Sequence, residues 1–116
     1  MAYDEKLADR VRGLLAGRRD VTEREMFGGL TFMVGGHMCC GVNGDELIVR
    51  LRPADAEAAL DRLGARPMDF TGRPMRGFVT VRPEGLKGQA LRRWVALAVE
   101  HGESLQPERK GTPTDE

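Results

Sequence analysis

The side chains in this sequence that are best suited to chemistry lie close together at positions 37 to 40. His37 and Cys39 are two residues apart, so on a β-strand they share a face, whereas the adjacent Cys39 and Cys40 point to opposite faces. Adjacent cysteines on a strand do not readily ligate one metal or form an unstrained disulfide. A metal site would have to use His37 and Cys39, but structural zinc needs four ligands and the only other histidine is His101. We therefore predict no metal or other cofactor, and His37 and Cys39 are the candidate ligands if a metal does bind.

Catalysis by the same residues would need more groups than the sequence offers. Cys39 could act as a nucleophile with His37 as its base, because neighbours on one strand face lie near hydrogen-bond reach. No third group orients the histidine, no oxyanion hole is recognisable, and the only serine, Ser104, falls near the end of the expected domain. The sequence thus predicts a protein without enzymatic activity. Cys40 is expected to fill space in the core and Cys39 to be a half-exposed thiol.

A basic stretch between positions 62 and 93 is the main candidate for binding a partner. The whole chain has no net charge at pH 7, with 18 basic and 18 acidic residues, which argues against a protein that coats nucleic acid. Within the stretch, Met75 follows Pro74 in a predicted loop, and an apolar side chain between arginines on a stiffened loop suits a protein contact. Arginines that simply cover solvated faces are the alternative. The candidate partner-binding residues are Arg73, Met75, Arg76, Arg92 and Arg93.

Length and composition indicate one globular domain. A chain of 116 residues with 41% hydrophobic and 31% charged residues can build a single core. No apolar stretch is long enough to cross a bilayer, and the first residues lack the basic and apolar regions of a secretory signal. We therefore expect a cytoplasmic protein with no membrane contact, one domain over residues 1–105 and a disordered tail over residues 106–116.

Two turn signals organise the middle of the chain into a three-stranded antiparallel meander. Gly35-Gly36 and Asn43-Gly44 accept positive φ angles, and alternating apolar runs flank both pairs. One face of the meander is expected to be buried. Its residues are Leu30, Phe32, Val34, Met38, Cys40, Val42, Leu47, Val49 and Leu51.

Three helices and three further strand segments are predicted around this meander. The strand segments are residues 21–27, an edge strand or extended approach, and residues 68–70, which pair with residues 78–82 around a loop over residues 71–77. The first helix is capped by Asp4 and has an inner face of Leu7, Val11, Leu14 and Leu15. The second begins at Pro53, has Ala56, Ala59, Leu60 and Leu63 at helical spacing, and ends just before Gly64. The third runs from about Leu86 to His101, is stopped by Gly102, and has an inner face of Leu91, Trp94, Val95 and Ala98. The order predicts an α+β fold, a mainly antiparallel sheet with a central β-meander flanked by an N-terminal, a middle and a C-terminal helix.

The chain from its first helix to about residue 105 resembles the N-terminal domain of the TfoX/Sxy family, bacterial proteins associated with the regulation of natural competence. The residues that carry the resemblance are Met26-Phe27-Gly28-Gly29, Phe32, Gly36, Met38, Gly41, Val42, the run 47–51 and Pro74-Met75 ahead of Phe78. The resemblance implies an α+β fold and a regulatory, non-enzymatic role in the cytoplasm. The motif at positions 26 to 29 is then a structural turn into the meander. Competence regulators of the family resemble two-domain proteins, and we expect this chain to be a stand-alone copy of the first domain.

These observations favour an interaction domain that regulates transcription by contact with another protein, either a transcription factor or a polymerase component. A metal or small-molecule sensor built on His37 and Cys39 is the alternative, and direct DNA binding is a third hypothesis with less support from the charge. The sequence leaves open whether the domain forms a homodimer.

Overall fold

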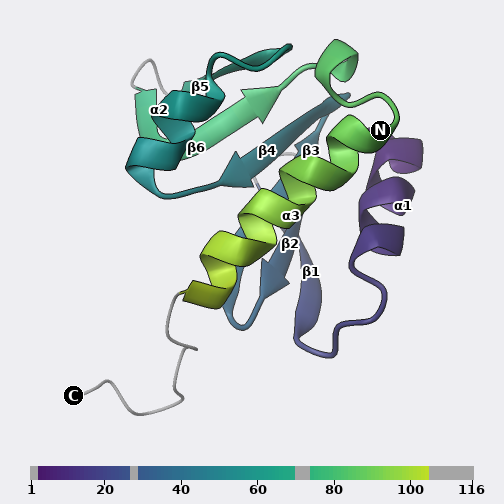
Figure 1. Ribbon diagram of the computed structural model, residues 1–116. Helices are drawn as coiled ribbons and strands as arrows, with labels where there is room; N and C mark the ends of the chain where they lie inside the picture. The colour runs from purple at the N-terminus through teal and green to yellow at the C-terminus, as the bar shows by residue number, and fades with distance from the viewer. Residues whose placement is uncertain (1–2, 27–28, 70–73, 105–116) are drawn as a thin grey trace, which may run out of the picture.

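Three α-helices and a six-stranded sheet make up the part of the chain that the structure describes, which is residues 3–26, 29–69 and 74–104 of a computed structural model. The helices are α1 (Glu5–Leu14), α2 (Pro53–Ala59) and α3 (Gln89–Ser104), and a short 3₁₀ helix, η1 (Pro83–Gly85), precedes α3. The strands are β1 (Val21–Met26), β2 (Gly29–Val34), β3 (His37–Asn43), β4 (Glu46–Arg50), β5 (Ala65–Asp69) and β6 (Pro74–Val81). The predicted α+β fold is confirmed (Figure 1). None of the described helices is long and apolar enough to span a bilayer.

The sheet has the order β1-β2-β3-β4-β6-β5, and all neighbouring strands are antiparallel. The predicted meander is β2, β3 and β4, and β1 adds the predicted edge strand. After β4 the chain crosses through α2 to the far edge, forms β5, and returns as β6 between the two. Because β4 and β5 are each antiparallel to β6, they run parallel to one another, and α2 is the crossover that packs on β6.

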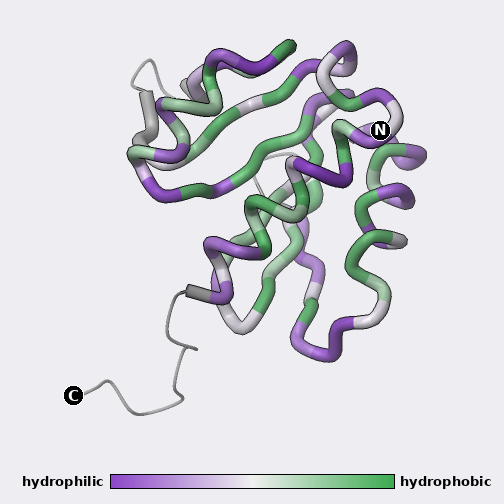
Figure 2. The backbone as a smooth tube through the Cα atoms, viewed as in Figure 1, coloured by the Kyte–Doolittle hydropathy of each residue, from purple (hydrophilic) through white to green (hydrophobic). Residues whose placement is uncertain are grey.

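The helices cover one face of the sheet, and the core lies between these two layers (Figure 1). Trp94 and Leu91 of α3 and Phe32 of β2 are among the largest fully buried side chains. Apolar and polar residues alternate along the tube of α1 and of α3, as expected for helices with one buried face (Figure 2). The predicted inner face of the last helix, Leu91, Trp94, Val95 and Ala98, is buried, and so are Leu30, Phe32, Val34, Cys40, Val42, Leu47, Val49 and Leu51.

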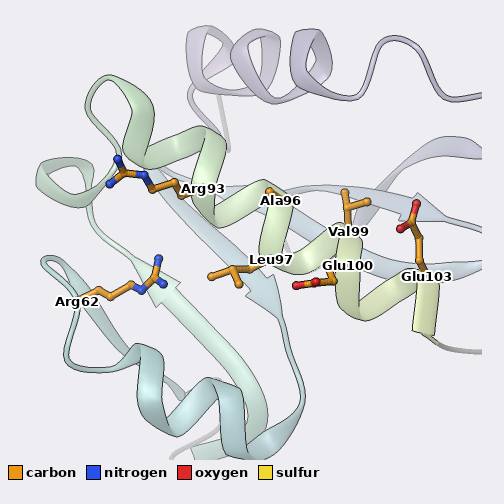
Figure 3. Close-up of a pocket in the computed structure, with 7 residues that line it drawn as sticks. All are labelled: Arg62, Arg93, Ala96, Leu97, Val99, Glu100 and Glu103. Carbon is orange, nitrogen blue, oxygen red and sulfur yellow. The ribbon is translucent and has the colours of Figure 1, made fainter.

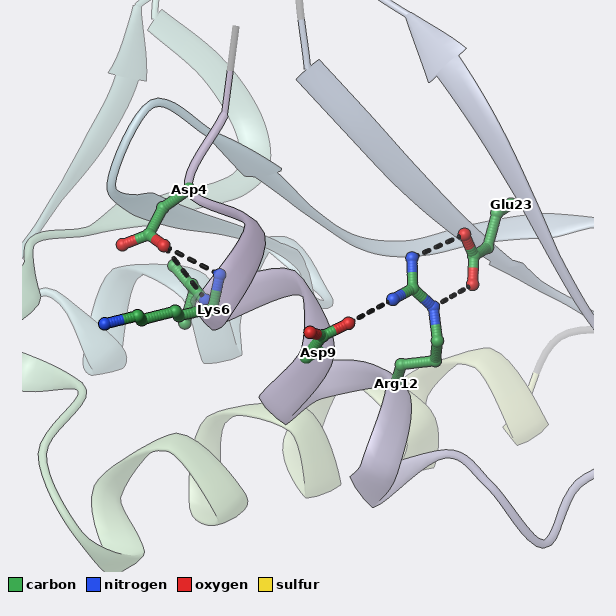
Figure 4. A network of polar contacts seen from close by, with 6 residues as sticks. Asp4, Lys6, Asp9, Arg12 and Glu23 are labelled. Carbon is green, nitrogen blue, oxygen red and sulfur yellow. Dashed lines mark hydrogen bonds and ion pairs between the residues drawn. The ribbon is translucent and has the colours of Figure 1, made fainter. Parts of the chain in front are cut away.

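The N-terminal helix is held at both ends by polar contacts (Figure 4). The Asp4 carboxylate accepts hydrogen bonds from the backbone N–H groups of Lys6 at 2.9 Å and Leu7 at 3.3 Å, which confirms the predicted cap. Further along α1, the Arg12 guanidinium donates to both carboxylate oxygens of Glu23 on β1, at 2.6 and 2.9 Å. These contacts set α1 over the β1 edge of the sheet. The hydrogen bond to Arg12 lowers the pKa of Glu23.

The predicted burial of two leucines and the predicted position of one turn are wrong. Leu14 is 38% exposed, because Leu7, Val11 and Leu15 already form the stripe that faces the sheet and Leu14 lies beside it. Leu63 is 71% exposed, because α2 ends at Ala59 and helical spacing does not apply beyond that point. The second hairpin turns at Gly44-Asp45 rather than Asn43-Gly44, since Asn43 still pairs with Glu46 across the strands.

The boundaries of the last helix also differ from the prediction. Gly88 has a φ of +58°, and Leu86 ends η1, so α3 begins at Gln89 rather than at Leu86. Gly102 does not stop the helix, which continues to Ser104. A glycine ends a helix when it adopts positive φ, and Gly102 is not among the described glycines that do so. The predicted tail lies outside the described residues.

Gly29 explains why the motif at positions 26 to 29 needs its second glycine. A Cβ atom at Gly29 would lie 2.3 Å from the carbonyl oxygen of Val42 on β3, well inside van der Waals contact. The glycine therefore permits close approach of the backbones at the start of β2. Phe27 and Gly28 of the motif lie outside the described residues, and Met26 ends β1.

We expect Gly29→Ala to destabilise the domain by about 1 to 3 kcal/mol, because β2 and β3 must move apart to accommodate the methyl group. The matched control is Gly13→Ala in α1, where nothing lies within 4 Å of the added Cβ and alanine has the higher helix propensity. Urea unfolding measures both changes in the free energy of unfolding. Equal stability of the two variants would contradict the structural role of Gly29.

Candidate functional site

A shallow groove runs along the exposed side of α3 (Figure 3). It encloses about 540 Å³ between α3 and the connection that follows α2. Arg62 and Arg93 lie at one end, and Glu100 and Glu103 lie toward the other, with apolar side chains between them. The full lining is Arg62, Arg93, Ala96, Leu97, Val99, Glu100 and Glu103. The groove thus has an apolar floor and charges of opposite sign at its two ends.

Some of the charged side chains in this groove already form ion pairs within the described part of the chain, and others do not. The Glu103 carboxylate accepts a hydrogen bond from Arg18 at 2.8 Å, and Arg18 also pairs with Asp20. The Arg62 guanidinium lies over the buried Trp94 ring, 5.3 Å from its centroid, in a cation–π contact. Within residues 3–26, 29–69 and 74–104, no ion pair involves Arg62, Arg93 or Glu100. These three charges remain available to a partner.

A second hollow lies on the other side of α3, where α1 meets it. It encloses about 270 Å³ and is lined by Arg10, Leu14, Gly88, Gln89, Leu91 and Arg92. The Arg10 guanidinium donates a hydrogen bond to the carbonyl oxygen of Leu86 at 3.0 Å, which holds this cation beside the start of α3. Arg92 and Arg93 are neighbours in sequence, yet they line different hollows because successive helical residues point about 100° apart.

Two of the other predicted contact residues, Met75 and Arg76, lie in β6. This strand begins at Pro74, so the loop predicted over residues 71–77 is too long. Its length is limited because Asp69 still pairs with Pro74 across the hairpin. Arg73 lies outside the described residues. Met75 and Arg76 therefore belong to the sheet rather than to a loop.

Sequence reasoning missed several residues that line the two hollows. The helical periodicity does not mark Arg10 or Leu14 as residues that contact a partner. Leu97 and Glu100 are likewise part of no motif that would mark them. Arg62 lies in the basic stretch, but its contact with Trp94 joins positions 32 residues apart in the chain. No local sequence signal reports such a contact.

A β-bulge at Cys39 changes the arrangement predicted for the two thiols. Phe32 pairs with Cys40 and Met33 pairs with Met38, so Cys39 is an extra residue in β3. The bulge interrupts the strict alternation of faces, and both cysteines are buried, at 1% and 0% exposure. The half-exposed Cys39 expected from sequence is wrong, as is the assignment of Met38 to the core face, since Met38 is partly exposed and lies opposite Met33. The prediction that Cys40 belongs to the core is confirmed.

The surroundings of these residues bear on metal binding and on reactivity. Among the described residues, no three His, Cys, Asp or Glu side chains are grouped so that they could hold a metal ion. The two cysteines are free thiols. A hydrogen bond with Cys39, together with full burial, raises the pKa of Cys40, which keeps that sulfur protonated near neutral pH. The same hydrogen bond lowers the pKa of Cys39, but burial of that thiol and the absence of a grouped set of ligands among the described residues give the His37 and Cys39 sensor no support.

We expect both thiols to react with a water-soluble disulfide reagent at least about 100-fold more slowly in the native protein than in urea. Burial excludes the reagent, so modification requires local or global unfolding. Absorbance of the released thiolate at several urea concentrations follows the reaction. Rapid reaction of one thiol in the native protein would show that Cys39 is accessible.

His101 lies near the end of α3, and the fold shifts its titration. Burial lowers the pKa of His101, and the nearby positive charges of Arg50 and Arg52 lower it further, whereas Asp55 opposes this. His37 lies close enough to contribute to the same lowering. The folded state therefore favours neutral His101 at pH values where an unfolded histidine, with a pKa of about 6.5, already binds a proton.

The free energy of unfolding should therefore decrease as the pH falls from about 7 to about 5.5, because the unfolded state takes up more protons in this window. Asp20 and Glu23, whose pKa values are lowered by pairing with Arg18 and Arg12, contribute pH dependence only at more acidic pH. His101→Gln should lose less stability than the wild type between these two pH values, as measured by urea unfolding. An undiminished loss in His101→Gln, with a smaller loss in a His37→Gln control, would assign the effect to the other histidine.

The chain was compared with family models, curated proteins and solved structures. No curated protein and no solved structure matched the chain. The family model described as the TfoX N-terminal domain matches residues 13–102, which include the six-stranded sheet, α2 and most of α3 but only the end of α1. This family consists of regulatory domains without catalytic activity. The match confirms the resemblance seen in the sequence, and the chain belongs to the TfoX N-terminal domain family.

Proposed function

We propose that this chain is a non-enzymatic regulatory domain that acts by binding another protein, as a competence-regulator-like domain would. Family membership supports the regulatory role. The observation that carries the mode of action is the hollow between α1 and α3, where an exposed leucine lies among arginines. We call this surface the α1–α3 hollow; it consists of Arg10, Leu14, Gly88, Gln89, Leu91 and Arg92.

The chemistry of the α1–α3 hollow suits an acidic partner with an apolar anchor. Leu14 is one of two large apolar side chains that are exposed among the described residues. Arg10 is oriented by its bond to the Leu86 carbonyl, and neither Arg10 nor Arg92 forms an ion pair within the described part of the chain. An apolar side chain of the partner would pack on Leu14 while carboxylates on either side meet the two guanidinium groups.

The other contact residues predicted from the sequence are not among the residues that define the α1–α3 hollow. Arg93 contributes if the partner reaches across α3, and the sequence candidates Arg73, Met75 and Arg76 are tested separately below. The expected partner is a transcription factor or a polymerase component in the cytoplasm. Contact with nucleic acid is less consistent with the zero net charge.

We expect Leu14→Asp/Arg92→Glu to reduce capture of the partner from native cytoplasm by at least about tenfold, because the change removes the anchor and reverses one charge. Quantitative mass spectrometry of captured proteins measures the loss. The identified partner, purified, then gives dissociation constants at several salt concentrations. Strong salt dependence of a nucleic-acid complex, with no protein captured, would instead support DNA binding.

The matched control is Leu63→Asp/Arg82→Glu, which changes one exposed leucine and one exposed arginine outside the α1–α3 hollow. This variant should retain the partner. A second variant, Arg73→Glu/Arg76→Glu, tests the hairpin separately. If Leu14→Asp/Arg92→Glu captures the same partner as the wild type while the hairpin variant does not, the contact surface is the β5–β6 hairpin and the hollow has no role.

A further inference from the structure

The groove on the other side of α3, lined by Arg93 and Glu100, has charges of opposite sign in an order that the α1–α3 hollow lacks. Arg93, Ala96 and Glu100 lie at i, i+3 and i+7 on the exposed side of the helix, and all three are exposed. Arg93 and Glu100 carry opposite charges, seven residues or about 10 Å apart along the helix axis. The small Ala96 lies nearly midway between them.

Such a pattern is complementary to itself when two copies of the helix meet antiparallel. A two-fold axis between Ala96 and Leu97 places Arg93 of one copy opposite Glu100 of the other, and symmetry repeats the contact. A parallel arrangement would oppose Arg93 to itself and Glu100 to itself. The charge order therefore selects one orientation of the two helices.

The packing of the groove is consistent with this contact. Ala96 leaves room for a second helix at the close axial separation, about 8 to 10 Å, that packed helices adopt. Leu97 and Val99 offer apolar surface next to it, since they are only partly buried within one copy. Arg62, held over Trp94, adds a second cation at the Arg93 end, where Glu100 of the other copy would lie (Figure 3).

Two other surfaces of the described part of the chain, the α1–α3 hollow and the β1 edge, lack this self-complementary pattern. In the α1–α3 hollow the charged side chains, Arg10 and Arg92, have the same sign. At the β1 edge, Glu23 and Glu25 share one face of the strand, and antiparallel self-pairing keeps residues of like face opposite each other. Glu23 is already paired with Arg12 of its own chain, and Glu25 has no basic side chain beside it on that face of β1, so self-pairing of this edge gains no opposite-charge contact.

We propose that the α3 groove binds a second copy of this chain, forming a two-fold dimer in which the α3 helices pack antiparallel with reciprocal Arg93–Glu100 ion pairs. This inference does not depend on the proposed regulatory contact, whose central residues, Leu14 and Arg92, line the hollow on the opposite side of α3. The dimer would present two α1–α3 hollows, one from each copy.

Sedimentation velocity of the wild-type chain over a wide concentration range tests the dimer directly. We expect a concentration-dependent dimer whose dissociation constant rises at least about tenfold in Arg93→Glu and likewise in Glu100→Arg, because each change creates two like-charge contacts. The controls Arg82→Glu and Glu84→Arg make the same charge changes at exposed positions away from α3 and should leave the dimer intact.

Mixing the two weakened variants gives the decisive measurement. In the mixture, two carboxylates of the Arg93→Glu chain would face two guanidinium groups of the Glu100→Arg chain, so a heterodimer should form with nearly wild-type affinity. The double variant Arg93→Glu/Glu100→Arg should also dimerise with itself, because the exchange of charges within one chain keeps the pattern self-complementary.

Several outcomes would overturn the dimer. The proposal is wrong if the wild-type chain stays monomeric over the whole concentration range, whatever else binds in the groove. A dimer that survives both single changes, or weakened variants that do not recover on mixing, also overturns it. Circular dichroism of each variant excludes unfolding as the cause of a loss.

Discussion

Packing of α3 against the middle of the sheet is the interaction on which the rest of this structure depends. Trp94, Leu91 and Ala98 on its inner side are buried, and α3 contacts β3, β4 and α1. Removal of this helix would take Trp94 and Leu91 out of the core and expose the apolar face of β3 and β4 on which it packs. Both hollows exist because α3 has a neighbour on each side in the same layer, α1 on one side and the chain after α2 on the other.

Trp94 couples this core to the surface. Its ring is 2% exposed, yet the Arg62 guanidinium lies against its face. A cation in this position is held by the core rather than by another charge, so its charge is not cancelled. Glu103 shows the opposite arrangement, because Arg18 neutralises it and ties the end of α3 to the turn before β1. The two ends of one groove thus differ in how much charge they offer to a partner.

Regular patterns in the sequence predict the layers of the fold, and local departures from regularity are not predictable from it. The Gly35-Gly36 turn and the alternation around Phe32 are sufficient for the hairpin of β2 and β3, because a hairpin is specified by neighbouring residues. The bulge at Cys39 depends on how β2 pairs with β3, which strand periodicity alone does not report. The sequence also indicates a basic surface, but the division of Arg92 and Arg93 between two hollows follows from the placement of α1 and α2.

The position of β6 between β4 and β5 has a consequence for how the chain folds. Strands β1 to β4 follow one another through short connections, so each new pair closes only a small loop. The contact of Arg50 with Phe78 joins residues on either side of the whole crossover and costs a much larger loop-closure entropy. Contacts of long sequence separation slow folding. The meander is therefore the part of the sheet that can form from local contacts, and docking of β6 beside β4 completes the sheet.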